Sequence, residues 1–206
     1  MKRTRARFST GTRTLGYLVF AIFALAATQT ASAADSYEFT GEVDSKWSSA
    51  GNWRFGSAGT QQSTVPSGGY NLNFWPSTKM PQSFADNPVV EIDGTYGTTY
   101  KLHVRNLGTE SAPVVFKADT DGHGVTAGAL NDSTGFFIAN DVGNAWLRLE
   151  KGTYTGGTWN IGNSGFIAHI VACDRVTMSG YQIRFRNGSF SATNTALTSV
   201  IKVVRA

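Results

Sequence analysis

Three aspartates lie in turn-like segments at a spacing that matches a repeat of the chain. Asp119 and Asp121 belong to an Asp-Thr-Asp-Gly segment, and Asp141 lies 22 positions after Asp119. Their carboxylate oxygens could hold a calcium ion, or act as acid and base on a glycosidic bond. The same residue types are common in ordinary turns. We favour turn chemistry for Asp119, Asp121 and Asp141, with a calcium site as the alternative and no other cofactor expected.

Two tryptophans offer a different kind of chemistry. Trp47 and Trp53 flank a Gly51-Asn52 turn near the start of the chain. Aromatic rings can stack on sugars, which makes both residues candidates for carbohydrate binding. They could instead cover the first strands of a sheet, where an open end would expose apolar core and unpaired backbone. We favour the covering role, since the architecture predicted below requires an N-terminal cap.

Sequence motifs of several catalytic classes are missing. The chain has no phosphate-binding loop, no His-Glu-x-x-His, no Gly-x-Ser-x-Gly and no Cys-x-x-Cys. Its single cysteine, Cys173, excludes an internal disulfide, and we expect a buried, inert thiol there. The sequence therefore favours a protein without catalytic activity.

Short apolar-x-apolar triplets recur through the second half of the chain. Their first residues are separated by 24, 22, 23 and 22 positions, at Val90, Val114, Phe136, Trp159 and Tyr181. Each triplet is typical of a short strand with one buried face. A second set follows about half a repeat later, at Leu102, Val125, Leu147 and Ile170.

This repeat predicts an all-β fold, a right-handed parallel β-solenoid of about five coils with an N-terminal β cap. If the interval is constant, equivalent residues stack on one another inside the coils. We expect one inward stack of Ile92, Phe116, Ile138, Ile161 and Ile183. We expect a second inward stack of Leu102, Val125, Leu147 and Ile170.

Residues 1–33 have the pattern of a secretory signal peptide. Five basic residues and no acidic one precede the apolar stretch from Leu15 to Ala27, and Ala31-Ser32-Ala33 forms a small-residue cleavage site. The apolar stretch is too short for a permanent bilayer-spanning helix. We therefore expect export to the extracellular space or the cell surface, with no stable membrane span after cleavage.

Removal of the signal peptide changes the charge argument. The whole chain carries 18 basic and 14 acidic residues, a net charge of +4, but five of the basic residues belong to the signal. The remaining chain has 13 basic and 14 acidic residues, a net charge of −1. This balance gives no reason to expect a nucleic acid as partner.

The exported chain divides into two parts by composition. Residues 34–88 contain Trp47, Trp53 and all five prolines but one, and we interpret them as an N-terminal cap with entry strands. Residues 89–206 contain the repeats and Gly/Asn turns, and we interpret them as solenoid coils. No stretch shows a sustained helical period, so we expect no helix.

Two segments carry a family resemblance: the Gly51-Asn52 turn between Trp47 and Trp53, and the run Trp159-Asn160-Ile161-Gly162-Asn163. They resemble the secreted, autotransporter-passenger-like β-solenoid proteins with Gly/Asn-rich strand repeats. The resemblance covers most of the exported chain. It implies no shared catalytic residues. We expect a structural or adhesin-like role at the cell surface, with a surface polysaccharide as a partner.

Two other functions stay open at this point. Solenoids also host polysaccharide lyases and glycoside hydrolases, for which Asp119 and Asp141 would be the residues to test. Several short strands could instead form a carbohydrate-binding β-sandwich, although regular repeats argue against it.

The last residues predict association between chains. Residues 196–206 hold Val200, Ile201, Val203 and Val204 with few charges, and contain no proline or tryptophan to cover an open coil. Exposed sheet edges recruit further strands unless such devices block them. We expect either the front part of a longer solenoid or an assembly surface, with self-association reduced by charged residues or proline at Val200 and Val203.

Overall fold

The computed structural model describes residues 36–56, 59–98, 100–129, 133–139 and 141–203, with the backbone alone for residues 199–203. The chain forms two compact units, residues 1–30 and 31–206. The first unit lies outside the described residues, as does the whole predicted signal peptide, residues 1–33. Every helix and strand described below belongs to the second unit.

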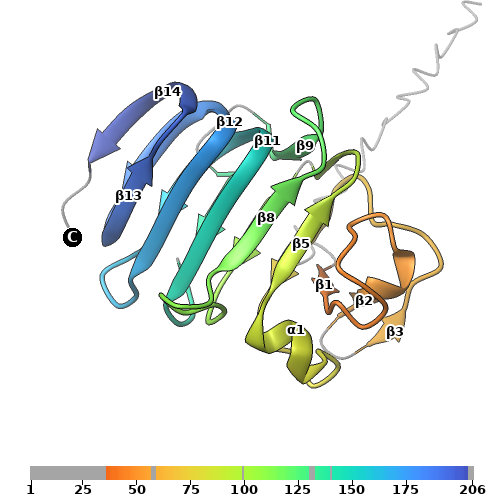
Figure 1. The fold of residues 1–206 in the computed structure, drawn as a ribbon. Coiled ribbons are helices and arrows are strands. Elements are labelled where there is room, and N and C mark those ends of the chain that lie inside the picture. The colour runs from red at the N-terminus through yellow and green to blue at the C-terminus, as the bar shows by residue number, and fades with distance from the viewer. Residues whose placement is uncertain (1–35, 57–58, 99, 130–132, 140, 204–206) are drawn as a thin grey trace, which may run out of the picture. The chain divides into compact units, whose positions relative to one another are not determined.

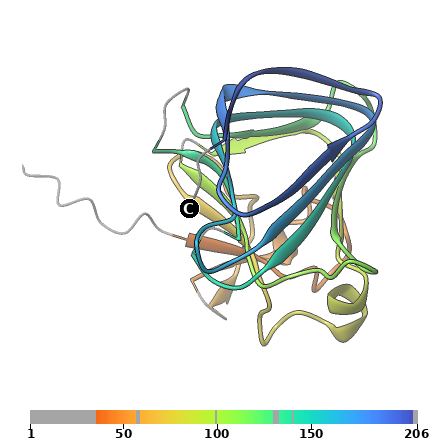
Figure 2. The same ribbon diagram turned by 90° about the vertical axis from the view of Figure 1, so that its left-hand side faces the viewer.

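The second unit is all-β, which confirms that part of the predicted fold class. The fourteen strands among the described residues belong to one hydrogen-bonded sheet. The sheet curls, so that strands distant in sequence face a common interior (Figures 1 and 2). Most of it consists of three sets of parallel strands, which we call the first, second and third columns.

Each column is a series of strands that pair side by side in parallel. The first column contains β5 (Val89–Ile92), β8 (Val114–Ala118), the first part of β11 (Ala145–Ile161), the first part of β12 (Ala168–Phe185) and β13 (Gly188–Ala192). The second contains β6 (Thr95–Thr98), β9 (Gly124–Ala127), the middle parts of β11 and β12, and the first part of β14 (Thr195–Val203). The third contains β1 (Ser36–Phe39), β4 (Asn71–Phe74), β7 (Lys101–Val104), β10 (Gly135–Ile138), and the last parts of β11, β12 and β14.

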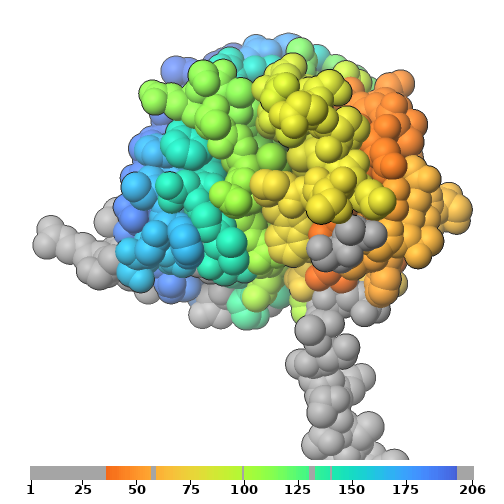
Figure 3. All heavy atoms as spheres, turned by 90° about the horizontal axis from the view of Figure 1, so that it is seen from below, coloured from red at the N-terminus to blue at the C-terminus, as the bar shows by residue number. Residues whose placement is uncertain are grey.

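The N-terminal part pairs differently from the columns. β1 is antiparallel to β2 (Trp53–Phe55), which is antiparallel to β3 (Thr60–Gln61). A 3-10 turn, η1 (Ala50–Asn52), precedes β2. The expectation of no helix was wrong, since α1 (Gln82–Asp86) follows Pro81. Figure 3 shows the segments side by side on one face in chain order, from the N-terminal orange to the C-terminal blue.

The predicted repeat interval holds only in the later strands. Phe136 is in register with Trp159, as the sequence predicts, whereas Trp159 is in register with Ile183, two positions after the predicted Tyr181. Phe116, however, is in register with Leu149, which comes much later in the chain than the interval predicts. The earlier connections are longer because they include extra loop residues, so a constant interval selects residues from different columns.

The first predicted stack is therefore buried but divided. Ile92, Phe116, Ile138, Ile161 and Ile183 are all fully buried. Ile92 and Phe116 lie in the first column and the other three in the third, where only Ile138 and Ile161 are in register with each other.

The second predicted stack is divided in the same way. Leu147 and Ile170 are in register in the first column, as predicted. Leu102 lies in the third column and Val125 in the second. All four side chains are buried, so the prediction identified the core but not its rows.

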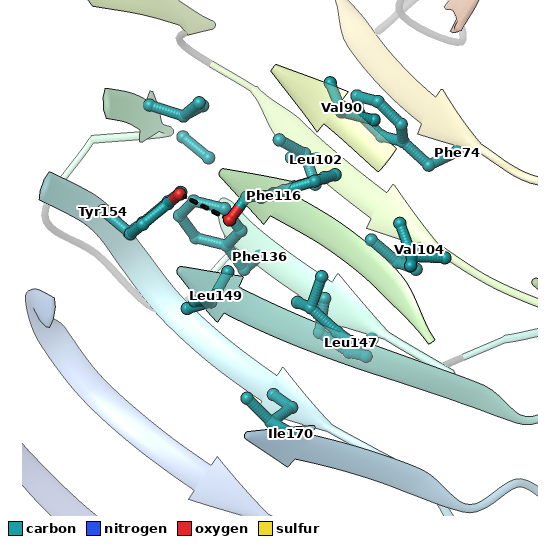
Figure 4. Close-up of a cluster of buried hydrophobic side chains, with 14 of the residues drawn as sticks. Phe74, Val90, Leu102, Val104, Phe116, Phe136, Leu147, Leu149, Tyr154 and Ile170 are labelled. Carbon is teal, nitrogen blue, oxygen red and sulfur yellow. Dashed lines mark hydrogen bonds between the residues drawn. The ribbon is translucent and has the colours of Figure 1, made fainter. Parts of the chain in front are cut away.

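Side chains from all three columns meet in one core (Figure 4). Phe136 and Trp159 stack with their ring centroids 3.8 Å apart and their planes at 7°. The buried hydroxyl of Tyr154 donates a hydrogen bond of 3.0 Å to the carbonyl oxygen of Phe116. This bond crosses from the second column to the first and satisfies a polar group that would be costly to bury alone.

Candidate functional site

The three predicted calcium ligands are not brought to one corner. Asp119 follows β8, which pairs with the first part of β11, whereas Asp141 comes after β10, which pairs with the last part of β11. The stacking of Asp119 on Asp141 that the spacing predicted is therefore wrong. Among the described residues, no group of three or more His, Cys, Asp or Glu side chains is placed to hold a metal ion.

Asp119 and Asp121 have basic partners at the exposed corner after β8. Asp119 Oδ1 lies 2.5 Å from His123 Nδ1, and Lys151 Nζ donates a hydrogen bond of 2.6 Å to the backbone oxygen of Asp119. Asp121 lies 3.4 Å from Arg175 Nη1. Exposed pairs of this kind add little to stability. Calcium binding by these carboxylates stays a prediction.

Asp141 belongs to a more buried polar cluster. Arg105, just after β7, donates from Nη1 to Asp141 Oδ2 at 2.5 Å and from Nη2 to Asn73 Oδ1 at 3.1 Å. His103 Nδ1 lies 3.7 Å from Asp141 Oδ2, which is too long for a hydrogen bond. The arrangement joins β4, β7 and the segment after β10.

The guanidinium of Arg105 also packs on an aromatic ring. Its central carbon lies 3.8 Å from the ring centroid of Trp75, an arrangement that favours the cation. Trp75 Nε1 donates a hydrogen bond of 2.6 Å to Glu38 Oε1, and Ser77 Oγ donates to Glu38 Oε2 at 3.1 Å. The buried carboxylate of Glu38 is thereby linked to Arg105 and to Asp141.

Burial and charge shift the pKa values in this cluster. Burial lowers the pKa of His103, because the charged imidazolium is poorly solvated there. Burial alone would raise the pKa of Asp141, but the contacts with His103 and Arg105 hold it below its ordinary value. His103 is therefore neutral and Asp141 charged in the folded protein near neutral pH.

These shifts predict that acid destabilises the fold in two steps. As the pH falls through 6.5, the ordinary pKa of a histidine, His103 takes up a proton in the unfolded chain before it does so in the folded protein. The free energy of unfolding therefore decreases as the pH falls below 6.5. The contribution of Asp141 is present above 3.8 and is lost as the pH falls through its lower folded pKa. Urea unfolding between pH 8 and pH 3 should show both steps, and His103→Gln should flatten the first. The same slope near pH 6 in His103→Gln would contradict this assignment.

The two tryptophans proposed for sugar stacking are inside the protein. Trp47 and Trp53 are both fully buried, so neither offers a ring face to a sugar in this structure. Trp53 Nε1 donates a hydrogen bond of 2.9 Å to the backbone oxygen of Trp47. Trp47 stacks on Tyr96 of β6, with centroids 5.5 Å apart and planes at 17°. This packing is the one expected of a cover over the first strands.

The other end of the sheet is more exposed. Within the described residues, β13 and β14 pair with β12 and with no further strand. Leu197 of β14 is in register with the fully buried Met178 of β12, yet 37% of Leu197 is exposed. Among the described residues, the sheet therefore presents a free edge at which the apolar side chain of Leu197 is partly exposed. The predicted contact residues Val200 and Val203 have side chains outside the described residues.

Cys173 is half-buried rather than buried, with its Sγ 3.7 Å from the carbonyl oxygen of Leu149. Among the described residues, no helix is long and apolar enough to cross a bilayer. The chain matches no family model, and no curated protein or solved structure is significantly similar to it. Function must therefore be argued from the geometry.

Proposed function

We propose that residues 34–206 form an exported, right-handed parallel β-solenoid, with residues 34–88 as its N-terminal cap and entry strands and residues 89–206 as its coils. The carrying observation is that β11 and β12 each pass through all three columns and pair in parallel over most of their length. Successive strands that pair in parallel at a nearly constant residue interval have the register expected of solenoid coils. Parallel pairing also disfavours the β-sandwich alternative, whose strands pair antiparallel.

The role we propose for this fold is structural or adhesive at the cell surface, without catalysis. Two features support it. The free edge at β13 and β14 is suited to strand addition, by another copy or by further chain. The signal-like residues 1–33 and the near-neutral charge of the rest favour a secreted protein over one that binds nucleic acid.

Duplication of one coil tests the solenoid directly. A second copy of residues 158–181, inserted between Tyr181 and Gln182, keeps the interval that brings Thr158 into register with Gln182. We expect the longer chain to unfold cooperatively and at least as stably, because each coil contacts only its neighbours. Urea unfolding followed by circular dichroism measures this.

The control is a Gly/Ser segment of equal length at the same position, which should disrupt β12 and unfold the chain. If the duplicated chain is as unfolded as this control, the solenoid is wrong and a fold with fixed strand number is favoured.

The enzyme alternative is distinguished by product release. Residues 34–206 would be incubated with a panel of polysaccharides, with and without calcium. We expect no turnover. Release of oligosaccharides that disappears in Asp119→Asn or Asp141→Asn would favour the lyase or hydrolase and would assign the activity to those carboxylates.

A further inference from the structure

A hollow on the outer face of the first column combines apolar and polar groups. Its volume is about 310 Å³, at the lower end of the range for small-molecule sites, and Pro113, Trp146 and Val171 form its apolar part. Trp146 is half-buried and stacks on the ring of His169, with centroids 5.2 Å apart and planes at 24°. The two residues are in register on β11 and β12, so their side chains are neighbours on the same face of the sheet.

Hydrogen-bond donors and acceptors surround this apolar part. Glu110 supplies a carboxylate, Arg148 a guanidinium, and His169 and Ser189 an imidazole and a hydroxyl. Arg148 Nε is held 2.6 Å from Glu150 Oε1, and His169 Nδ1 lies 2.7 Å from Ser189 Oγ. These contacts fix the positions of donors and acceptors before any ligand arrives, which lowers the cost of binding.

We infer that this hollow binds a saccharide unit of a neutral polysaccharide. A sugar ring has an apolar C–H face that packs on an aromatic ring, and hydroxyl groups that both donate and accept hydrogen bonds. The rim carries charges of both signs, from Glu110 and from Arg148 paired with Glu150, so no single sign selects a polyanion or a polycation. The inference rests on the proposed adhesive function and moves the sugar contact from Trp47 and Trp53 to Trp146.

Calorimetric titration of residues 34–206 with soluble oligosaccharides tests the site. The probes are neutral oligomers of β-glucan, α-glucan, chitin, mannan and galactan. We expect binding of at least one, weakened about tenfold or more by Trp146→Ala, as for an aromatic residue at the centre of a contact. If Trp146→Ala fails to fold, Glu110→Ala and Arg148→Ala test the same site, because both change exposed side chains of the hollow. Each should weaken binding of the same oligosaccharide.

Tyr181→Ala is the matched control, because Tyr181 is an aromatic residue on β12 that is 52% exposed and lies outside the hollow. Its titration should equal that of the unchanged chain. Failure of every oligosaccharide to bind, or equal binding by the Trp146, Glu110 and Arg148 variants, overturns the saccharide site. A duplicated chain that folds but binds no sugar would overturn this site alone and leave the solenoid intact.

Discussion

Replacement of Trp159 by alanine is expected to lower the free energy of unfolding by about 3–5 kcal/mol. The side chain is fully buried in the third column. It stacks on Phe136, and its Nε1 donates a hydrogen bond of 3.2 Å to the carbonyl oxygen of Ser179. The substitution would leave a cavity against Phe136 and remove the hydrogen bond to Ser179, and both effects reduce stability.

Urea unfolding of residues 34–206, followed by circular dichroism, measures this loss. The control is Tyr181→Ala, which removes an aromatic ring that is 52% exposed on the neighbouring strand β12. It should change the unfolding free energy by less than about 0.5 kcal/mol. Equal losses in the two variants would show that the third column is not packed as described.

The sequence pattern predicted the later strands better than the earlier ones. Around Trp159, the connections between successive passes are short and nearly constant, so one interval leads from Phe136 to Trp159 and on to Ile183. Before β10, loops of different length intervene, and the same interval joins Phe116 to Ile138, which lie in different columns. Alternation of apolar residues indicates burial in either case, because it depends on the local strand alone.

The polar cluster around Arg105 could not be predicted in this way. Its members are Glu38 of β1 and three residues from the segments after β4, β7 and β10: Trp75, Arg105 and Asp141. No constant interval relates them, and they meet because these strands are neighbours in the third column. The spacing instead predicted that Asp141 would stack on Asp119 at one corner. Sugar stacking stayed open as the alternative for Trp47 and Trp53 for a similar reason, since sequence gives the residue type but not which ring faces remain exposed.

The hollow at Trp146 could not be predicted from the sequence repeat either. Inward positions repeat as apolar residues and can be recognised, whereas outward positions vary freely. Trp146 and His169 are in register and are separated by the same interval as Phe136 and Trp159, so the repeat interval applies to this outward pair too. The repeat alone does not indicate that outward residues lie side by side on neighbouring strands, whereas the parallel register of β11 and β12 shows that they do.

The free edge predicts that purified residues 34–206 self-associate. Interior strands of the second column have a strand on both sides, and Met178 is fully buried there. Leu197, the residue in register with Met178 on β14, remains 37% exposed. A partner strand beside β14 would bury this side chain and pair its backbone, which together favour association.

Leu197→Lys is therefore expected to weaken self-association by about tenfold or more, because burial of a leucine contributes about 1.5–3 kcal/mol and a charge is costly to bury. Sedimentation velocity over a concentration series measures the equilibrium. Tyr181→Lys is the matched control, since it adds the same charge at an exposed residue of β12, one strand in from the edge. A monomer at every concentration would contradict the free edge as an assembly surface. An equal effect of both lysine variants would assign the change to net charge, and the edge would then not be the contact.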